Sequence, residues 1–191
     1  MPVENEIKLA APDLDALHRK LEQLGCRVTA PRSLERNDVL DNAAGERRFN
    51  GELLRIREWR GSGVLTFKGR DRGRRHKSRE EIETEVAPDA ARELFARLGY
   101  RTVFRYEKYR TELAPPAAPG HVTLDETPIG DFIELEGPPE WVDDMAARLG
   151  FSPADYITSS YASLFRKFSL QNHLSAADMV FGANGLRPDP K

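Results

Sequence analysis

The chain has 191 residues, enough for one domain with a short extension. It is 39% hydrophobic and 31% charged with a formal net charge of -2, so it can bury a core, and no global positive charge favours nucleic acid or a membrane surface. The single cysteine, Cys26, excludes an internal disulfide and predicts a small buried thiol in a reducing compartment. No apolar run has transmembrane length, so we predict a cytoplasmic protein that does not contact the membrane.

The N-terminal half of the chain alternates between strand and helix patterns. "VENEIKL" over residues 3–9 alternates charged and apolar side chains, and residues 12–25 place leucines at helical spacing before a glycine. A strand followed by a polar turn is predicted over residues 37–51. The segments "ELLRIREW" and "GVLTFKGR" around "RGSG" predict a hairpin over residues 52–70.

The same patterns continue through the C-terminal half. They predict a basic loop over 70–78, a strand over 79–86, a helix over 88–100, a long strand over 101–113, a loop over 114–120, a strand pair over 121–137, and helices over 139–150 and 155–168. Residues 1–170 are therefore predicted to form one domain. Residues 171–191 lack periodicity and predict a loosely ordered C-terminal tail.

Seven of the predicted strands share one pattern, with an apolar face opposite a face of long ionisable side chains. The charged positions are Glu4, Glu6, Lys8, Arg55, Arg57, Lys68, Arg79, Glu81, Glu83, Glu85, Lys108, Arg110, Asp125, Glu134 and Glu136. A solvated face would normally include more Thr, Ser, Gln and Asn. Two like charges about 4 Å apart repel by about 4 kcal/mol at an effective dielectric near 20, so stacking them is poor design for stability alone.

Both kinds of charge become useful if the faces converge on a ligand. Carboxylate oxygens suit hard divalent cations, and Arg and Lys suit phosphate oxygens, so a polyphosphate bound with Mg²⁺ or Mn²⁺ would use both sets. Eight antiparallel strands can close around a small ligand. The predicted fold class is therefore α+β, an eight-stranded antiparallel β-barrel or tunnel with a polar, charged interior and helices covering its apolar outside.

These segments resemble, in order, the CYTH superfamily, the triphosphate tunnel metalloenzymes. "VENEIKL" is similar to the ExExK signature of that family, and "LLRIRE", "LTFKGR", "REEIETEV", "YEKYR", "VTLDETPIGDFIELEG" and "SSYASLF" continue the resemblance over residues 3–168. ExExK alone occurs often by chance, whereas the ordered set is specific. The resemblance implies a tunnel that binds triphosphate, in a family that includes class IV adenylate cyclases and thiamine, inorganic and RNA triphosphatases.

The resemblance also implies roles for individual residues. Metal ligands would be Glu4, Glu6, Glu134 and Glu136; phosphate-binding residues would be Lys8, Arg55, Arg57, Lys68, Lys108 and Arg110; and Glu4, Glu6, Lys8 and Lys68 would form the catalytic set. Arg79, Glu81, Glu83 and Asp125 would support them by orienting basic residues or helping to hold a metal. Which of the charged residues over 79–85 face the lumen stays open, because one bulge would reverse their direction.

The predicted function is metal-dependent hydrolysis of an inorganic or small organic triphosphate: tripolyphosphate, thiamine triphosphate or ATP. One alternative is a class IV-type adenylate cyclase that converts ATP to cyclic AMP and pyrophosphate. A second is a non-catalytic polyphosphate-binding module, which would gain little from paired carboxylates. Nucleic acid is not expected as a partner, because the basic stretch from Lys68 to Arg79 lacks interleaved aromatics. A homodimer is left open.

Four histidines and one tyrosine are given no part in this prediction. The histidines lie scattered over predicted helix, loop and strand ends, so we assign them no metal or acid–base role. Tyr161 is expected to pack a terminal helix against the barrel.

Overall fold

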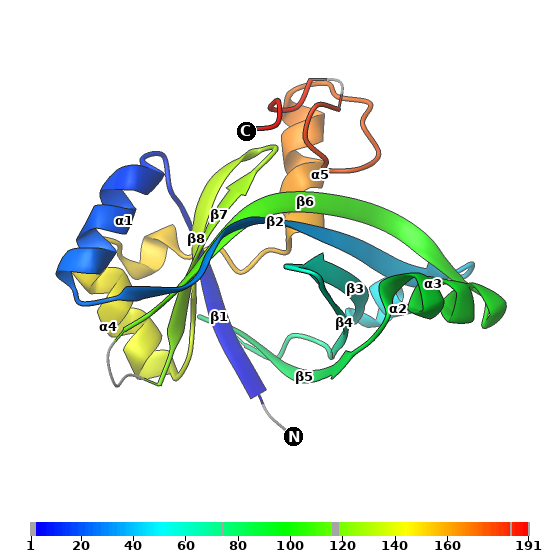
Figure 1. The fold of residues 1–191 in the computed structure, drawn as a ribbon, viewed down its shortest axis with the longest axis horizontal. Coiled ribbons are helices and arrows are strands. Elements are labelled where there is room, and N and C mark those ends of the chain that lie inside the picture. The colour runs from blue at the N-terminus through cyan, green and yellow to red at the C-terminus, as the bar shows by residue number, and fades with distance from the viewer. Residues whose placement is uncertain (1–2, 74, 116–118, 184, 191) are drawn as a thin grey trace.

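The computed structural model describes residues 3–73, 75–115, 119–183 and 185–190, and of residues 3 and 4 only the backbone. In these ranges eight strands and five α-helices follow one another (Figure 1): β1 (Val3–Ala10), α1 (Leu14–Gln23), β2 (Arg27–Asn42), α2 (Glu46–Asn50), β3 (Leu53–Trp59), β4 (Ser62–Lys68), β5 (Lys77–Glu85), α3 (Pro88–Arg97), β6 (Tyr100–Ala114), β7 (His121–Thr127), β8 (Gly130–Glu136), α4 (Pro139–Leu149) and α5 (Tyr161–Gln171). A short 3-10 helix spans Pro153–Asp155. Within the described part of the chain, no helix has both the length and the apolar character needed to cross a bilayer.

The strands form a closed antiparallel barrel in the order β1-β5-β4-β3-β2-β6-β7-β8, which confirms the predicted fold class. β1 closes the barrel because it pairs with β5 over its first half and with β8 over its second half. β2 and β6 form the longest pair and run across most of the molecule (Figure 1). Register shifts around Pro31, between Ala30 and Ser33, bend this pair, because a β-bulge increases the local curvature of a strand.

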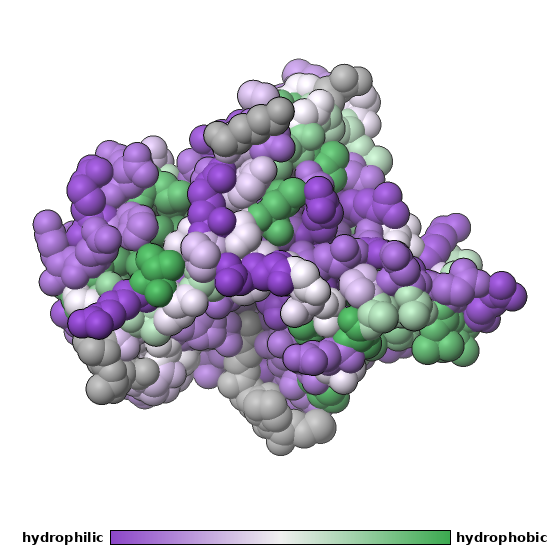
Figure 2. Space-filling model, viewed as in Figure 1, coloured by the Kyte–Doolittle hydropathy of each residue, from purple (hydrophilic) through white to green (hydrophobic). Residues whose placement is uncertain are grey.

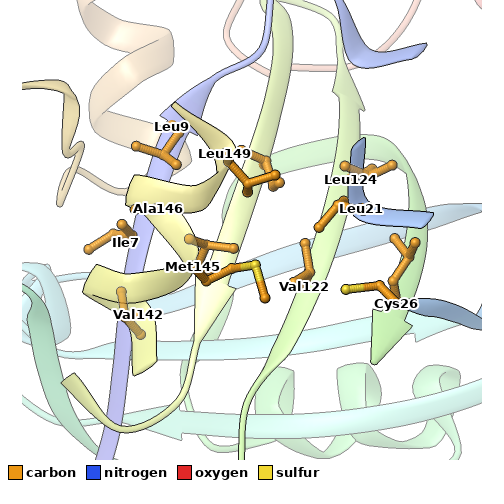
Figure 3. Packing of buried hydrophobic residues seen from close by; sticks show 13 residues of the cluster. Ile7, Leu9, Leu21, Cys26, Val122, Leu124, Val142, Met145, Ala146 and Leu149 are labelled. Atoms are coloured by element: carbon orange, nitrogen blue, oxygen red, sulfur yellow. The ribbon is translucent and has the colours of Figure 1, made fainter. Parts of the chain in front are cut away.

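The apolar faces of the strands point outward and are covered by helices. Ile7 of β1 and Ile133 of β8 are almost completely buried in a cluster that includes Val142 and Met145 of α4 (Figure 3). α1 and α4 lie side by side over this part of the barrel (Figure 1). The largest apolar core is therefore outside the barrel, between strands and helices.

A second apolar cluster covers another part of the barrel wall, whereas the outer face of β5 is less covered. α3 contacts β3, β4 and β6 around Leu40, Leu54 and Ile56. The outer face of β5 is more open, and Ile82 on it is 49% exposed. On the face shown in Figure 2 the surface is mostly hydrophilic, with hydrophobic residues in separate patches.

The segment after α5 contacts the barrel at several described residues. Met179 is fully buried and pairs with Tyr106 at the edge of β6, beyond the residues that β7 reaches. Tyr109 donates a hydrogen bond to Asp189 at 2.7 Å. The backbone pairing at Met179 covers a part of the β6 edge that β7 does not reach. The division into a domain over 1–170 and a tail over 171–191 stays a prediction.

Three predicted boundaries differ from the structure. β2 begins ten residues before the predicted start at residue 37, since Pro31 and its bulge hide the strand pattern. β5 begins at Lys77, inside the predicted basic loop. Residues 156–160 are not helical, because α5 begins only after Ser160, whose side chain accepts a hydrogen bond from the Ser163 N–H. The predicted loop over 114–120 falls partly outside the described residues.

The outward core predicts a stability difference between two isoleucines. Ile133→Ala should lower the free energy of unfolding by about 2–5 kcal/mol, because it leaves a cavity in a fully buried cluster. The half-exposed Ile82→Ala should cost less than about 1 kcal/mol. Urea unfolding of both variants measures this, and an equal loss at the two positions would show that the apolar core does not lie under α4.

Candidate functional site

The inward faces of the strands enclose one cavity of about 360 Å³, which we call the lumen cavity. Most of the predicted site residues line it: Glu6, Lys8, Arg55, Arg57, Lys68, Arg79, Glu81, Glu83, Lys108, Arg110, Glu134 and Glu136. The direction of β5 is thereby settled, since Arg79, Glu81 and Glu83 line the cavity. The backbone of Glu4 lies opposite Arg79 in the barrel, but its side chain is outside the described part.

Asp125 lies beneath the cavity and holds its basic residues. It is completely buried, and its two oxygens accept hydrogen bonds from Lys108 at 2.8 Å, from Arg110 at 2.7 Å and from the Tyr161 hydroxyl at 2.8 Å. A buried carboxylate with this many donors fixes the position of each cation. This geometry fits the predicted supporting role of Asp125.

Glu35 is a second buried carboxylate, which the sequence analysis missed. It is fully buried, with Lys108 Nζ at 3.5 Å and Arg110 Nε at 3.9 Å, and it accepts a hydrogen bond from Asn37 at 2.9 Å. Burial raises the pKa of Glu35, but the positive charges of Lys108 and Arg110 lower it by more than burial raises it. The net result is a pKa of about 2. Alternation along β2 places it on the lumen side two residues before Asn37, the predicted start of the strand.

Lys8 and Glu134 form an ion pair between β1 and β8. They lie directly opposite each other in the strand register, and Lys8 Nζ donates to Glu134 Oε1 at 2.6 Å. Arg110 also contacts Glu134. Burial raises the pKa of Glu134, but Lys8, Lys108 and Arg110 together lower it well below its ordinary value. Glu134 is therefore an anion that already neutralises two lumen cations.

Glu6 and Glu136 are the carboxylates best placed for a metal ion. They lie directly opposite each other on β1 and β8, and both line the lumen cavity. Like charges opposite each other on paired strands destabilise a sheet, whereas a divalent cation between them would stabilise it. Among the described residues no group of three or more metal-type ligands gathers, and Glu6 instead contacts the ammonium of Lys77.

Lys77 is the most informative residue that the sequence analysis missed. It lies opposite Glu6 in the register of β1 and β5, is only 7% exposed and lines the lumen cavity. Burial lowers its pKa to about 8, and the Glu6 charge opposes this shift. The alternation of the strand could have identified Lys77, because Lys77 and Arg79 are two residues apart and share a face. The basic run over 70–78 hid this pattern, since it was predicted to be a loop.

The part of the wall formed by β3, β4 and β5 presents the β3 arginines Arg55 and Arg57, which have few local acceptors. Arg55 donates to the Tyr106 hydroxyl and to Thr66, each at 3.2 Å, and both Arg55 and Arg57 lie 3.7 Å from Glu83. The buried Nε of Arg55 has no hydrogen-bond partner within the described residues. Since buried donors are normally paired, this wall is suited to an anionic ligand.

Tyr161 and one histidine also line the cavity. Tyr161 packs α5 against Tyr106 and Phe132, as predicted, and the ammonium of Lys8 lies 4.7 Å from its ring centre. His121 lies at the rim with Nε2 3.3 Å from Glu136, which raises the pKa of the imidazole.

Comparison with known proteins identifies the family. The CYTH domain matches residues 3–161. This chain belongs to the CYTH family. Adenylate cyclase CyaB of Aeromonas hydrophila is 30% identical over 174 residues, covering 84% of this chain and 87% of that protein.

Solved structures show the same fold. The PH1819 protein of Pyrococcus horikoshii has a TM-score of 0.73 and 26% identity, covering 86% of this chain and 98% of its own. A candidate adenylyl cyclase of Hippeastrum, described as having a dominant triphosphatase activity, has a TM-score of 0.64 and 22% identity, covering 87% and 96%.

The buried position of Glu35 predicts a pH-dependent contribution to stability. Its pKa is lower in the folded than in the unfolded state, so its stabilisation is present above about pH 4.5 and is lost as the pH falls toward 2. Glu35→Gln should therefore lower the free energy of unfolding by about 3 kcal/mol at pH 7 and by progressively less below pH 4.5. Urea unfolding from pH 7 to pH 3 measures the difference, and a constant difference would contradict the assignment.

Proposed function

We propose that this CYTH protein is a divalent-metal-dependent triphosphatase that acts on an inorganic or small organic triphosphate inside the barrel. The observation that supports it best is the division of the lumen cavity into two parts. Opposed carboxylates stand on β1 and β8, and arginines with few acceptors stand on β3. A phosphate chain bound with a cation needs both at once.

Six basic residues would bind the phosphate oxygens: Lys8, Arg55, Arg57, Lys68, Lys108 and Arg110. Phosphoryl transfer depends mainly on positioning and on stabilising negative charge, so cations held rigidly by Asp125 and Glu35 cost no reorganisation during the reaction. Lys8 and Lys68 would contact the phosphate that is transferred. Arg79, Glu81 and Glu83 would keep this basic wall in place.

Glu4, Glu6, Glu134 and Glu136 would hold Mg²⁺ or Mn²⁺, with Glu6 and Glu136 as the first pair. Such an ion supplies charge neutralisation at phosphate oxygens and lowers the pKa of bound water. Glu134 contacts Lys8 and Arg110 in this structure. When substrate binds, these two side chains would exchange their contacts with Glu134 for contacts with phosphate oxygens, which would leave Glu134 available to the metal ion. We place the enzyme in the cytoplasm, in keeping with its single cysteine.

Adenylate cyclase activity is the second candidate, and the name of the Aeromonas relative favours it. Cyclisation needs groups that hold the adenine and the ribose, whereas the described lining of the lumen cavity consists mainly of charged side chains. Hydrolysis needs only the phosphate site and water. We therefore rank hydrolysis first.

Product analysis separates these reactions. Purified protein with Mg²⁺ or Mn²⁺ should release orthophosphate from tripolyphosphate, thiamine triphosphate or ATP, and Glu6→Gln should lower this rate at least about 100-fold, because electrostatic groups of this kind contribute that much. Glu85→Gln, an exposed change at the far end of β5 outside the lumen cavity, is the matched control. Cyclic AMP from ATP would favour the cyclase, and binding without turnover would favour a polyphosphate-binding module.

Lys77 provides a test of the metal site that does not depend on turnover. Because its ammonium contacts Glu6, it should compete with a divalent cation for that carboxylate. Lys77→Met should tighten Mn²⁺ binding in the absence of substrate by about tenfold, equivalent to about 1.4 kcal/mol. Isothermal titration measures this, with Lys167→Met, an exposed change on α5, as the control. Unchanged or weaker Mn²⁺ binding would place the cation away from Glu6.

A further inference from the structure

A second cavity of about 790 Å³ adjoins the lumen cavity between α2, β6 and α5. The two cavities share wall residues, including Leu53, Arg79, Phe104 and Ser160. The two cavities therefore lie next to each other, and a chain-like ligand held in the barrel would reach the second cavity past these residues. Figure 1 shows α5 beside β6.

Arginines dominate the charge of this second cavity, which we call the arginine annex. Its lining includes Arg47, Arg48, Arg79, Arg101 and Arg166. The acidic residues of the same wall are already engaged. Asp41 accepts hydrogen bonds from the backbone N–H groups of Arg47 and Arg48, at 3.0 and 3.1 Å, and Glu52 pairs with Arg47 at 2.8 Å.

Three annex arginines are left without a carboxylate. Within the described residues, Arg48, Arg101 and Arg166 form no ion pair, although they come from three separate elements: α2, β6 and α5. In the lumen cavity, by contrast, Lys8, Lys108 and Arg110 each contact a carboxylate. Like charges around one hollow repel and create a positive potential, which an anion relieves.

The chemistry of the annex favours phosphate over a nucleobase. Guanidinium groups match phosphate oxygens in a bidentate geometry. Two aromatic residues, Phe104 and Phe165, line the annex and stack on each other with ring centroids 5.7 Å apart. Phe104 also stacks on Tyr106 at 5.7 Å, so its faces are already engaged. A base would find no free face on Phe104, whereas a phosphate chain would find three arginines that form no ion pair within the described residues.

We propose that the arginine annex binds the phosphate groups that follow the third along a linear polyphosphate. Its substrate class then includes linear polyphosphates longer than tripolyphosphate. This inference rests on the proposed function, because it requires the lumen cavity to hold the first three phosphates. The annex adds affinity and length preference without taking part in the chemical step.

The test compares binding of two chain lengths without metal by isothermal titration. The wild type should bind a linear polyphosphate several times longer than tripolyphosphate at least about tenfold tighter than tripolyphosphate itself, because the added phosphates reach charge-assisted donors. The variant Arg48→Ala, Arg101→Ala, Arg166→Ala should lose most of that difference. It should still hydrolyse tripolyphosphate at the wild-type rate.

A matched variant controls for net charge. Arg19→Ala, Arg27→Ala, Arg97→Ala removes three exposed arginines that line neither cavity, and it should keep the length preference. An equal loss in both variants, or a wild type without length preference, would overturn the inference. The inference would also be overturned if the annex variant bound ATP more weakly than the wild type does but bound the longer polyphosphate equally well.

The proposed function has a separate readout. Failure of the wild type to hydrolyse tripolyphosphate would count against that function alone, since the binding comparison does not use turnover.

Discussion

Charge pairing inside a closed barrel is the constraint on which this structure depends. Each buried ion costs several kcal/mol of desolvation unless partners replace the water it loses. Asp125 meets that need for Lys108 and Arg110 at once, and Glu134 does so for Lys8. Because the charged faces occupy the inside, the apolar faces must point out, and α1, α3 and α4 are needed to cover them.

In the described part of the chain, some basic residues of the site have carboxylate partners and others do not, and the two kinds lie in different parts of the site. Beneath the lumen cavity, Asp125 already pairs with Lys108 and Arg110. On β3 the Arg55 Nε lacks an acceptor within the described residues, and in the annex Arg48, Arg101 and Arg166 form no ion pair with a described carboxylate. A phosphate chain bound as we propose would therefore contact cations that already have carboxylate partners near Asp125, and arginines with fewer acceptors on β3 and in the annex. In the proposed function a cation would join it at Glu6 and Glu136, which lie opposite each other on β1 and β8.

Strand alternation made much of this site predictable. Charged residues two apart on β1, β3 and β8 share a face whatever the register, so their convergence followed once the barrel closed. Lys77 and Glu35 were missed because each precedes the recognised start of its strand, one within a basic run and the other after a proline bulge. The annex was out of reach for a different reason: α2, β6 and α5 are distant in sequence, and only the folded chain brings their arginines to one cavity.

The most direct measurement is the position of cation and phosphate in a crystal grown with Mn²⁺ and a non-hydrolysable triphosphate. The anomalous signal of manganese should lie between Glu6 and Glu136, with the phosphate chain against Arg55 and Arg57 inside the barrel. A manganese peak and phosphate density on the outer surface, with the lumen holding only water, would contradict the account.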